Sequence, residues 1–84
     1  MNPSKLLRRL ASGALNNVSF ADFRRLIEAC GFELERIQGS HQIFRHRRVC
    51  KELVLQPLKN GDAKPYQIRQ FLYLIEEYHV KVEE

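Results

Sequence analysis

Two short segments that flank Gly39-Ser40 constrain the fold of this chain most strongly. Residues 32–37 alternate in polarity as a half-buried strand does, and residues 42–45 can form its antiparallel partner. Glycine at the first position of a two-residue loop suits a type II′ turn, because the positive φ required there is costly for other residues. The pattern therefore predicts a hairpin with His41 at the start of its second strand.

The same register predicts which side chains share a face of the hairpin. Strict alternation places Phe32, Leu34 and Ile43 on one face, together with Gln38 and His41 near the turn. This face would run from apolar at its base to polar at its tip. We therefore expect His41 at the rim of the hydrophobic core.

Helical patterns lie on both sides of the hairpin. A short leucine stripe ends before Gly13, a second helix begins after the N-cap Ser19 and ends at Gly31, and a third begins at Pro65. Residues 52–56 predict a third strand. The helical apolar positions expected in the core are Phe20, Phe23, Ile27, Cys30, Ile68, Phe71, Leu72, Ile75 and Tyr78. The order predicts an α+β fold, α-α-β-β-β-α, in which a three-stranded antiparallel sheet carries helices on one face.

Composition excludes several classes of protein. A chain of 84 residues with 44% hydrophobic and 29% charged residues predicts one small globular domain. Two cysteines without a CxxC pair favour a reduced cytoplasmic protein, and no apolar run is long enough for a membrane span. Three scattered histidines without convergent carboxylates predict neither a metal site nor a cofactor.

Positive charge is concentrated in the first part of the chain. Residues 1–51 hold ten Lys/Arg and four Asp/Glu, a net +6, whereas residues 52–84 hold four and six, a net −2. We expect the cations around the hairpin to surround its tip and to attract nucleic acid in a salt-dependent manner, although they could simply be solvated. These residues are Arg36, Arg45, Arg47, Arg48 and Lys51. His46 is expected on the strand face opposite His41, in solvent, and His79 at a helix end.

From Phe20 to Val80 the chain resembles the HicA-type toxins of bacterial toxin-antitoxin systems. The motifs that carry the resemblance are Cys30-Gly31-Phe32 at the end of a helix, Gly39-Ser40-His41 with Phe44 three residues on, and the basic turn into the last helix. The resemblance implies a fold like that of a double-stranded-RNA-binding domain. It also divides the chain into a helical extension and connector, residues 1–18, and a HicA-like ribonuclease domain, residues 19–84.

Function follows from the same resemblance. It implies a toxin that cleaves messenger RNA, with His41 as the active-site residue, and a cognate HicB-type antitoxin protein as its partner. A second histidine that many members carry at the end of the third strand is missing, since this chain reads Leu55-Gln56-Pro57-Leu58 there.

Elementary chemistry is compatible with one catalytic histidine. RNA supplies its own nucleophile, the 2′-hydroxyl, so that a metal-independent endoribonuclease needs a general acid or base near neutral pKa and some charge stabilisation. Candidate RNA contacts around His41 are Arg36, Gly39, Ser40, Arg45, Lys59 and Lys64. Three alternatives stay open: a non-catalytic RNA-binding module of the same fold, a protein-interaction domain for an acidic partner, and a Cys-His nucleophile pair that joins His41 to Cys30 or Cys50.

Overall fold

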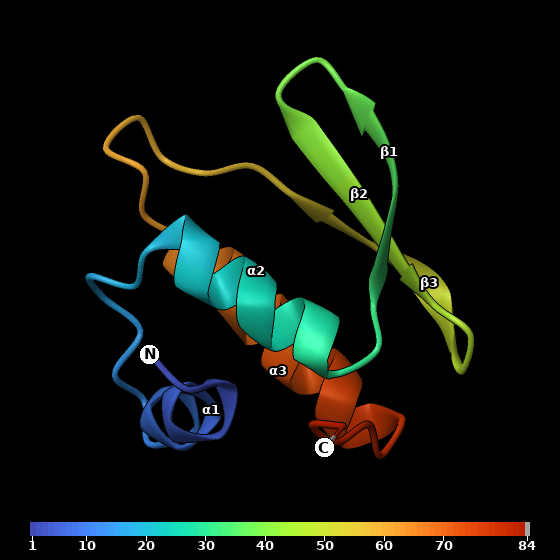
Figure 1. Cartoon of the computed structure of the whole chain (residues 1–84), viewed down its shortest axis with the longest axis horizontal. Helices are drawn as coiled ribbons and strands as arrows, with labels where there is room; N and C mark the ends of the chain where they lie inside the picture. Colours follow the sequence, from blue (N-terminus) through green and yellow to red (C-terminus); the bar gives the residue numbers. More distant parts are fainter. Residues whose placement is uncertain (84) are drawn as a thin grey trace.

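A computed structural model describes residues 1–83 of the chain, and it has the expected α+β architecture (Figure 1). The sheet is antiparallel with strand order β1-β2-β3, and α2 and α3 lie on the same side of it. The elements are α1 (Pro3–Ala11), α2 (Phe20–Ala29), β1 (Glu33–Gln38), β2 (His41–His46), β3 (Val49–Leu55) and α3 (Pro65–Glu77). The predicted fold class, like that of a double-stranded-RNA-binding domain, is confirmed.

Local capping explains where α2 begins and ends. The side chain of Ser19 accepts a hydrogen bond from the backbone N–H of Asp22 at 3.1 Å, which satisfies one of the free donors at the helix start. Gly31 ends the helix with φ of +95°, a conformation that residues with a side chain rarely adopt. Both signals were predicted from the sequence.

The extension before α2 contributes to the core. Leu6 and Leu10 of α1 are each 1% exposed, and α1 packs against α2. Leu15 and Val18 of the connector join the same buried cluster. The first 18 residues are therefore packed onto the remainder of the domain. Glu84, the last residue of the expected 19–84 domain, lies outside the described residues.

The hairpin has the predicted turn. Gln38 pairs with His41, so that Gly39 and Ser40 form a two-residue loop. Gly39 has φ of +61°, and Ser40 is not among the residues with positive φ, as a type II′ turn requires. His41 opens β2 at the end of the hairpin that projects away from the helices (Figure 1).

A β-bulge makes the predicted face assignment wrong. Leu34 pairs with Phe44, but the next pair is Arg36 with Ile43, and Glu35 is left without a partner. The extra residue reverses the alternation, because directly paired residues share a face. Phe32 and Leu34 therefore pack toward the helices.

Ile43, Gln38 and His41 lie on the opposite side of the sheet. Arg36, Ile43 and Val54 are paired in one row across the three strands, and His41 is two residues from Ile43 on β2. We call this side the open face, because α2 and α3 cover the other side. His41 consequently lies on the open face and not at the rim of the core.

Aromatic contacts hold the helices to the sheet. Phe71 of α3 meets Phe23 of α2 with ring centroids 5.5 Å apart and Phe32, just before β1, at 5.9 Å. All three rings are at most 2% exposed. The third strand begins at Val49, three residues before the predicted start, since Val49 pairs with His46 across the two-residue turn Arg47-Arg48. Within residues 1–83, no helix is both long and apolar enough to cross a membrane.

Candidate functional site

His41 is an exposed imidazole at the end of the open face. Its ring forms no hydrogen bond or ion pair with residues 1–83. The two-residue turn and the pairing with Gln38 fix its backbone, so that its position follows from the sequence around Gly39. A fixed backbone and an accessible ring are what a residue that transfers protons to a bound ligand requires.

An ion-pair network occupies the middle of the open face. Arg36 donates to the carboxylates of Glu35 at 2.8 Å and Glu52 at 2.9 Å, and Arg45 lies 3.5 Å from the same Glu52 oxygen. The hydrogen bond from Arg36 lowers the pKa of the Glu52 carboxyl below its ordinary value. Ile43, which is paired with Arg36 in the sheet, is 3% exposed. Two of the predicted RNA contacts, Arg36 and Arg45, are thus partly neutralised by carboxylates.

A groove of about 370 Å³ joins His41 to β3 and α3. Its lining includes Lys51, an exposed cation that forms no ion pair with residues 1–83, and two exposed tyrosines, Tyr66 and Tyr73. Lys51 was expected in the basic cluster but not as an RNA contact, and the two tyrosines were not predicted as site residues. Their positions at i and i+7 of a predicted helix could have identified them as one outward-facing pair.

The remaining predicted contacts lie in two loops. Gly39 and Ser40 form the exposed hairpin tip beside His41. Lys59 is in the loop that leads to α3, and this loop is bound to the start of α2 by a hydrogen bond from Ala63 N–H to the carbonyl oxygen of Val18 at 2.7 Å. Lys64 precedes α3 as its N-cap residue, one turn or less from the part of the helix that lines the groove.

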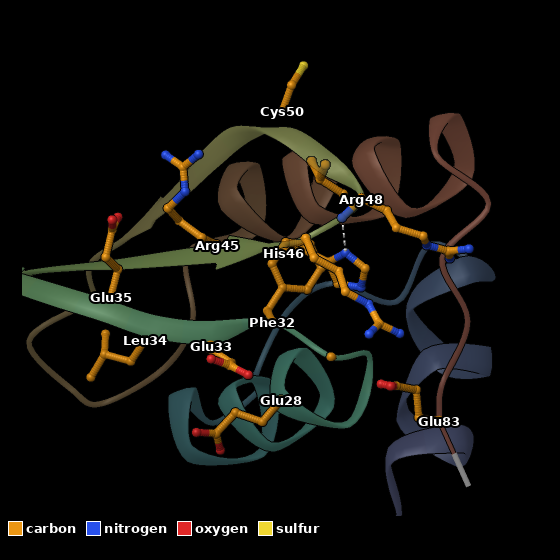
Figure 2. Close-up of a pocket in the computed structure, with 13 residues that line it drawn as sticks. Glu28, Phe32, Glu33, Leu34, Glu35, Arg45, His46, Arg48, Cys50 and Glu83 are labelled. Carbon is orange, nitrogen blue, oxygen red and sulfur yellow. Dashed lines mark hydrogen bonds between the residues drawn. The ribbon is translucent and has the colours of Figure 1, made fainter.

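The prediction that His46 is solvated is wrong. It ends β2 on the helix side, is 8% exposed, and its ring lies 5.0 Å from that of Phe32 (Figure 2). Its Nε2 lies 3.1 Å from the carbonyl oxygen of Cys30, and its Nδ1 accepts from the backbone N–H of Arg48 at 3.0 Å. These contacts match a neutral ring that donates through Nε2. His46 therefore has a structural role, since it links the end of α2 to the turn between β2 and β3.

The expectation that cations surround the hairpin tip is wrong for Arg47 and Arg48. Arg47 and Arg48 form the turn after β2, at the opposite end of the strand from His41. His46 lies five positions after His41 on β2, a separation of about 17 Å along the strand. Arg48 instead donates to the backbone oxygen of His79 at 3.1 Å. The concave region at this end, about 860 Å³, mixes arginines with glutamates (Figure 2). Its lining shares no residue with that of the groove at His41.

Comparison with known protein families identifies the chain. Residues 20–76, which are 57 of the 84, match the model of the family described as the HicA toxin of bacterial toxin-antitoxin. The chain belongs to the HicA toxin family. Searches of curated proteins and of solved structures found no significant match. The matched residues run from the start of α2 into the last turn of α3, so that they contain the hairpin, His41 and the groove.

Family membership makes this protein a toxin of a toxin-antitoxin system, and it implies a cognate antitoxin. The helix α1 precedes the matched residues, although Leu6 and Leu10 are buried in the common core. This HicA toxin therefore has an additional helix that completes its core on the side of α2.

Neither cysteine of this HicA toxin lines the groove at His41. Cys30 is buried at the end of α2, and burial raises the pKa of its thiol to about 11. Cys50 is exposed, with its Sγ 2.9 Å from the hydroxyl of Tyr78. The geometry does not support the Cys-His pair. Within residues 1–83, no three His, Cys, Asp or Glu side chains converge as metal ligands.

Proposed function

We propose that this HicA toxin is a metal-independent endoribonuclease that cleaves messenger RNA, with His41 as its general acid or base. The observation that carries the proposal is the exposed imidazole of His41, which has no partner among residues 1–83 and lies in a groove that also contains the cation Lys51. The groove thus contains a proton-transfer group at one end and, farther along β3, a cation for the phosphate backbone.

The chemistry needs only groups that RNA and this groove supply. His41 takes the proton of a 2′-hydroxyl, the 2′-oxygen attacks the adjacent phosphorus, and the bond from phosphorus to the 5′-oxygen breaks. The leaving oxygen receives a proton from solvent or from the His41 imidazolium formed in the first step. The products are a 2′,3′-cyclic phosphate and a 5′-hydroxyl. Lys51 lies about opposite Arg45 on β2, roughly 13 Å along the strand from His41, so that it is suited to bind a neighbouring phosphate of the RNA chain.

Phosphate contacts on either side of the cleaved linkage complete the proposal. Lys64, at the start of α3, and Lys59 form no ion pairs with residues 1–83. Arg36 and Arg45 are available only in part, because both contact Glu52. We also assign the exposed backbone of Gly39 and Ser40 to the approach of the RNA chain, since the turn presents no large side chain there.

A non-catalytic RNA-binding module is the second candidate. One observation favours it, namely that no side chain among residues 1–83 hydrogen-bonds the His41 ring and fixes its tautomer. Orienting groups of this kind accompany many catalytic histidines, whereas a binding module needs none.

The cognate antitoxin, which we propose to be of the HicB type, would inhibit by covering His41. Among residues 1–83, no helix covers the open face, and its exposed side chains include Val54, 39% exposed, which pairs with Ile43. Occlusion of this face would block RNA without any change of fold. In a complex with the antitoxin, hydrogen exchange should therefore slow in β2 and β3, and cleavage should stop. Protection restricted to the outer faces of the helices would contradict direct masking.

A substrate analogue tests the chemistry. An RNA that wild-type toxin cleaves at a mapped linkage is compared with the same RNA carrying a single 2′-deoxynucleotide at that linkage, both in excess EDTA. We expect the all-ribose RNA to be cut to a cyclic phosphate and the deoxy linkage to survive. Loss of cleavage in EDTA, or cleavage at the deoxy linkage, would indicate a water-activating mechanism. RNA that binds and is never cleaved would favour the binding module.

A further inference from the structure

Two tyrosines stand out on the exposed side of α3. Tyr66 is 55% exposed and Tyr73 is 63% exposed, the largest exposure of any hydrophobic side chain noted in the described chain. They are seven residues apart, so that they lie on one face of the helix, about 10.5 Å apart along its axis. Two exposed aromatic rings on one face of a helix form a surface on which a flat ligand can stack.

Both rings border the groove that contains His41. The floor of this groove is formed by side chains that are at most 6% exposed, namely Leu53, Gln67 and Leu74. Gln67 also positions Tyr66, since its Nε2 donates to the tyrosine hydroxyl at 3.3 Å while its Oε1 accepts from the backbone N–H of Gln56 at 3.1 Å. Tyr66 is thus held beside the groove by a buried amide.

The charge along this wall fits a polyanion. From Pro65 to Ile75, α3 contains no acidic residue, and its one arginine, Arg69, lies outside the groove lining. Lys51 lines the opposite side of the groove. The single carboxylate in the lining, Glu52, is bound to Arg36 and Arg45 on the open face. Flat exposed rings beside cations are the arrangement by which proteins hold unpaired nucleotides.

We propose that Tyr66 and Tyr73 stack on unpaired bases of single-stranded RNA and lead the chain to His41, so that this toxin selects unpaired regions of its substrate. The inference rests on the proposed function, because it takes RNA as the substrate. Bases in a duplex stack on one another, and their faces are not available to the tyrosines. Gln70 lies between the two rings in sequence and also lines the groove, where its amide can hydrogen-bond a base edge.

Binding is tested without cleavage, in the His41→Ala background. Tyr66→Leu and Tyr73→Leu remove the rings, and Tyr66→Phe and Tyr73→Phe are the matched controls that keep them. Each variant is titrated with a fluorescent single-stranded RNA and with a duplex of the same length. Each leucine variant should bind the single strand about 5- to 150-fold more weakly, and the phenylalanine variants should bind nearly as wild type does. Duplex affinity should change less than about twofold.

Intrinsic fluorescence gives a second readout. The chain has three tyrosines and no tryptophan, so that base stacking should quench its tyrosine emission. We expect single-stranded RNA to quench the wild-type emission and to quench the Tyr66→Leu/Tyr73→Leu variant clearly less. Because both side chains are exposed, thermal melting should show that the variants remain folded.

Several results would overturn the inference. Unchanged affinity of the leucine variants for the single strand would do so, and so would equal losses for single strand and duplex. If the leucine variants bind RNA normally but fail to bind the cognate antitoxin, the tyrosines belong to the protein interface instead. Cleavage by the wild type is measured in parallel. If the wild type cleaves RNA and the leucine variants bind RNA with unaltered affinity, the stacking alone is rejected. If binding depends on the tyrosines but the wild type does not cleave RNA, the proposed catalysis alone is rejected.

Discussion

Replacement of Glu52 by glutamine should make this toxin bind RNA more tightly. Glu52 is the shared counterion of Arg36, at 2.9 Å, and of Arg45, at 3.5 Å, on the open face. As long as the carboxylate is charged, each arginine must give up part of this pairing before it can bind a phosphate. Glutamine keeps the size of the side chain and removes the charge, so that Arg45 loses its carboxylate partner and Arg36 keeps only Glu35.

The magnitude follows from counterion release. Each additional phosphate contact with a single strand steepens the dependence of log K on log salt by about 0.7. One or two freed arginines should therefore steepen the slope by about 0.7 to 1.4. Between about 50 and 200 mM salt, the affinity of Glu52→Gln should fall by an additional factor of about 3 to 7 relative to the parent.

The assay is a salt titration of RNA binding by fluorescence anisotropy in the His41→Ala background. Glu28→Gln is the matched control, because it removes the same charge and frees an arginine, Arg24, which lies 3.5 Å from Glu28 on α2. Its slope should stay close to that of the parent. A Glu52→Gln slope equal to that of Glu28→Gln, or weaker binding at low salt, would refute the assignment of Arg36 and Arg45 to the RNA surface.

Three further predictions concern stability and reactivity. His46→Ala should lower the free energy of unfolding by about 2 to 4 kcal/mol in urea denaturation, because it leaves the Cys30 carbonyl and the Arg48 N–H without their buried partner; a loss below about 0.5 kcal/mol would contradict that role. At pH 8 a thiol reagent should modify Cys50 but not the buried Cys30, whose thiol has a pKa of about 11, and modification of both in the folded protein would contradict this. Pairing with Arg36 lowers the pKa of Glu52 in the folded state below its ordinary value of 4.5. The stability that this pair contributes should therefore be fully present above pH 4.5 and should be lost as the pH falls through the lowered pKa. The difference in Tm between wild type and Glu52→Gln should therefore shrink below pH 4.5, and a difference that grows there would show the opposite sign.

Local signals made the helices and the hairpin turn predictable. The N-cap at Ser19, the stop at Gly31 and the positive φ at Gly39 each depend on one residue and its immediate neighbours. The position of His41 at the start of β2 follows from the same turn. Such signals can be read without knowledge of distant contacts.

Features that depend on distant residues could not be predicted in the same way. The bulge at Glu35 has no Gly or Pro to mark it, and it moved His41 to the open face. Glu52 neutralises Arg36 from 16 positions along the chain, and only the pairing of all three strands brings them together. The ring of His46 contacts the carbonyl oxygen of Cys30 at the end of α2. The alternation of residues along β2 carries no information about that distant contact.

The central claim is that His41 transfers protons during RNA cleavage. Its most direct test compares single-turnover cleavage by wild type, His41→Ala and the control His79→Asn, which removes another exposed histidine while asparagine tolerates its φ of +54°. We predict that His41→Ala lowers the cleavage rate by about 10² to 10⁴ while RNA affinity changes less than about twofold, and that His79→Asn cleaves as wild type does. Cleavage by His41→Ala at the wild-type rate, with the fold intact by circular dichroism, would contradict the account.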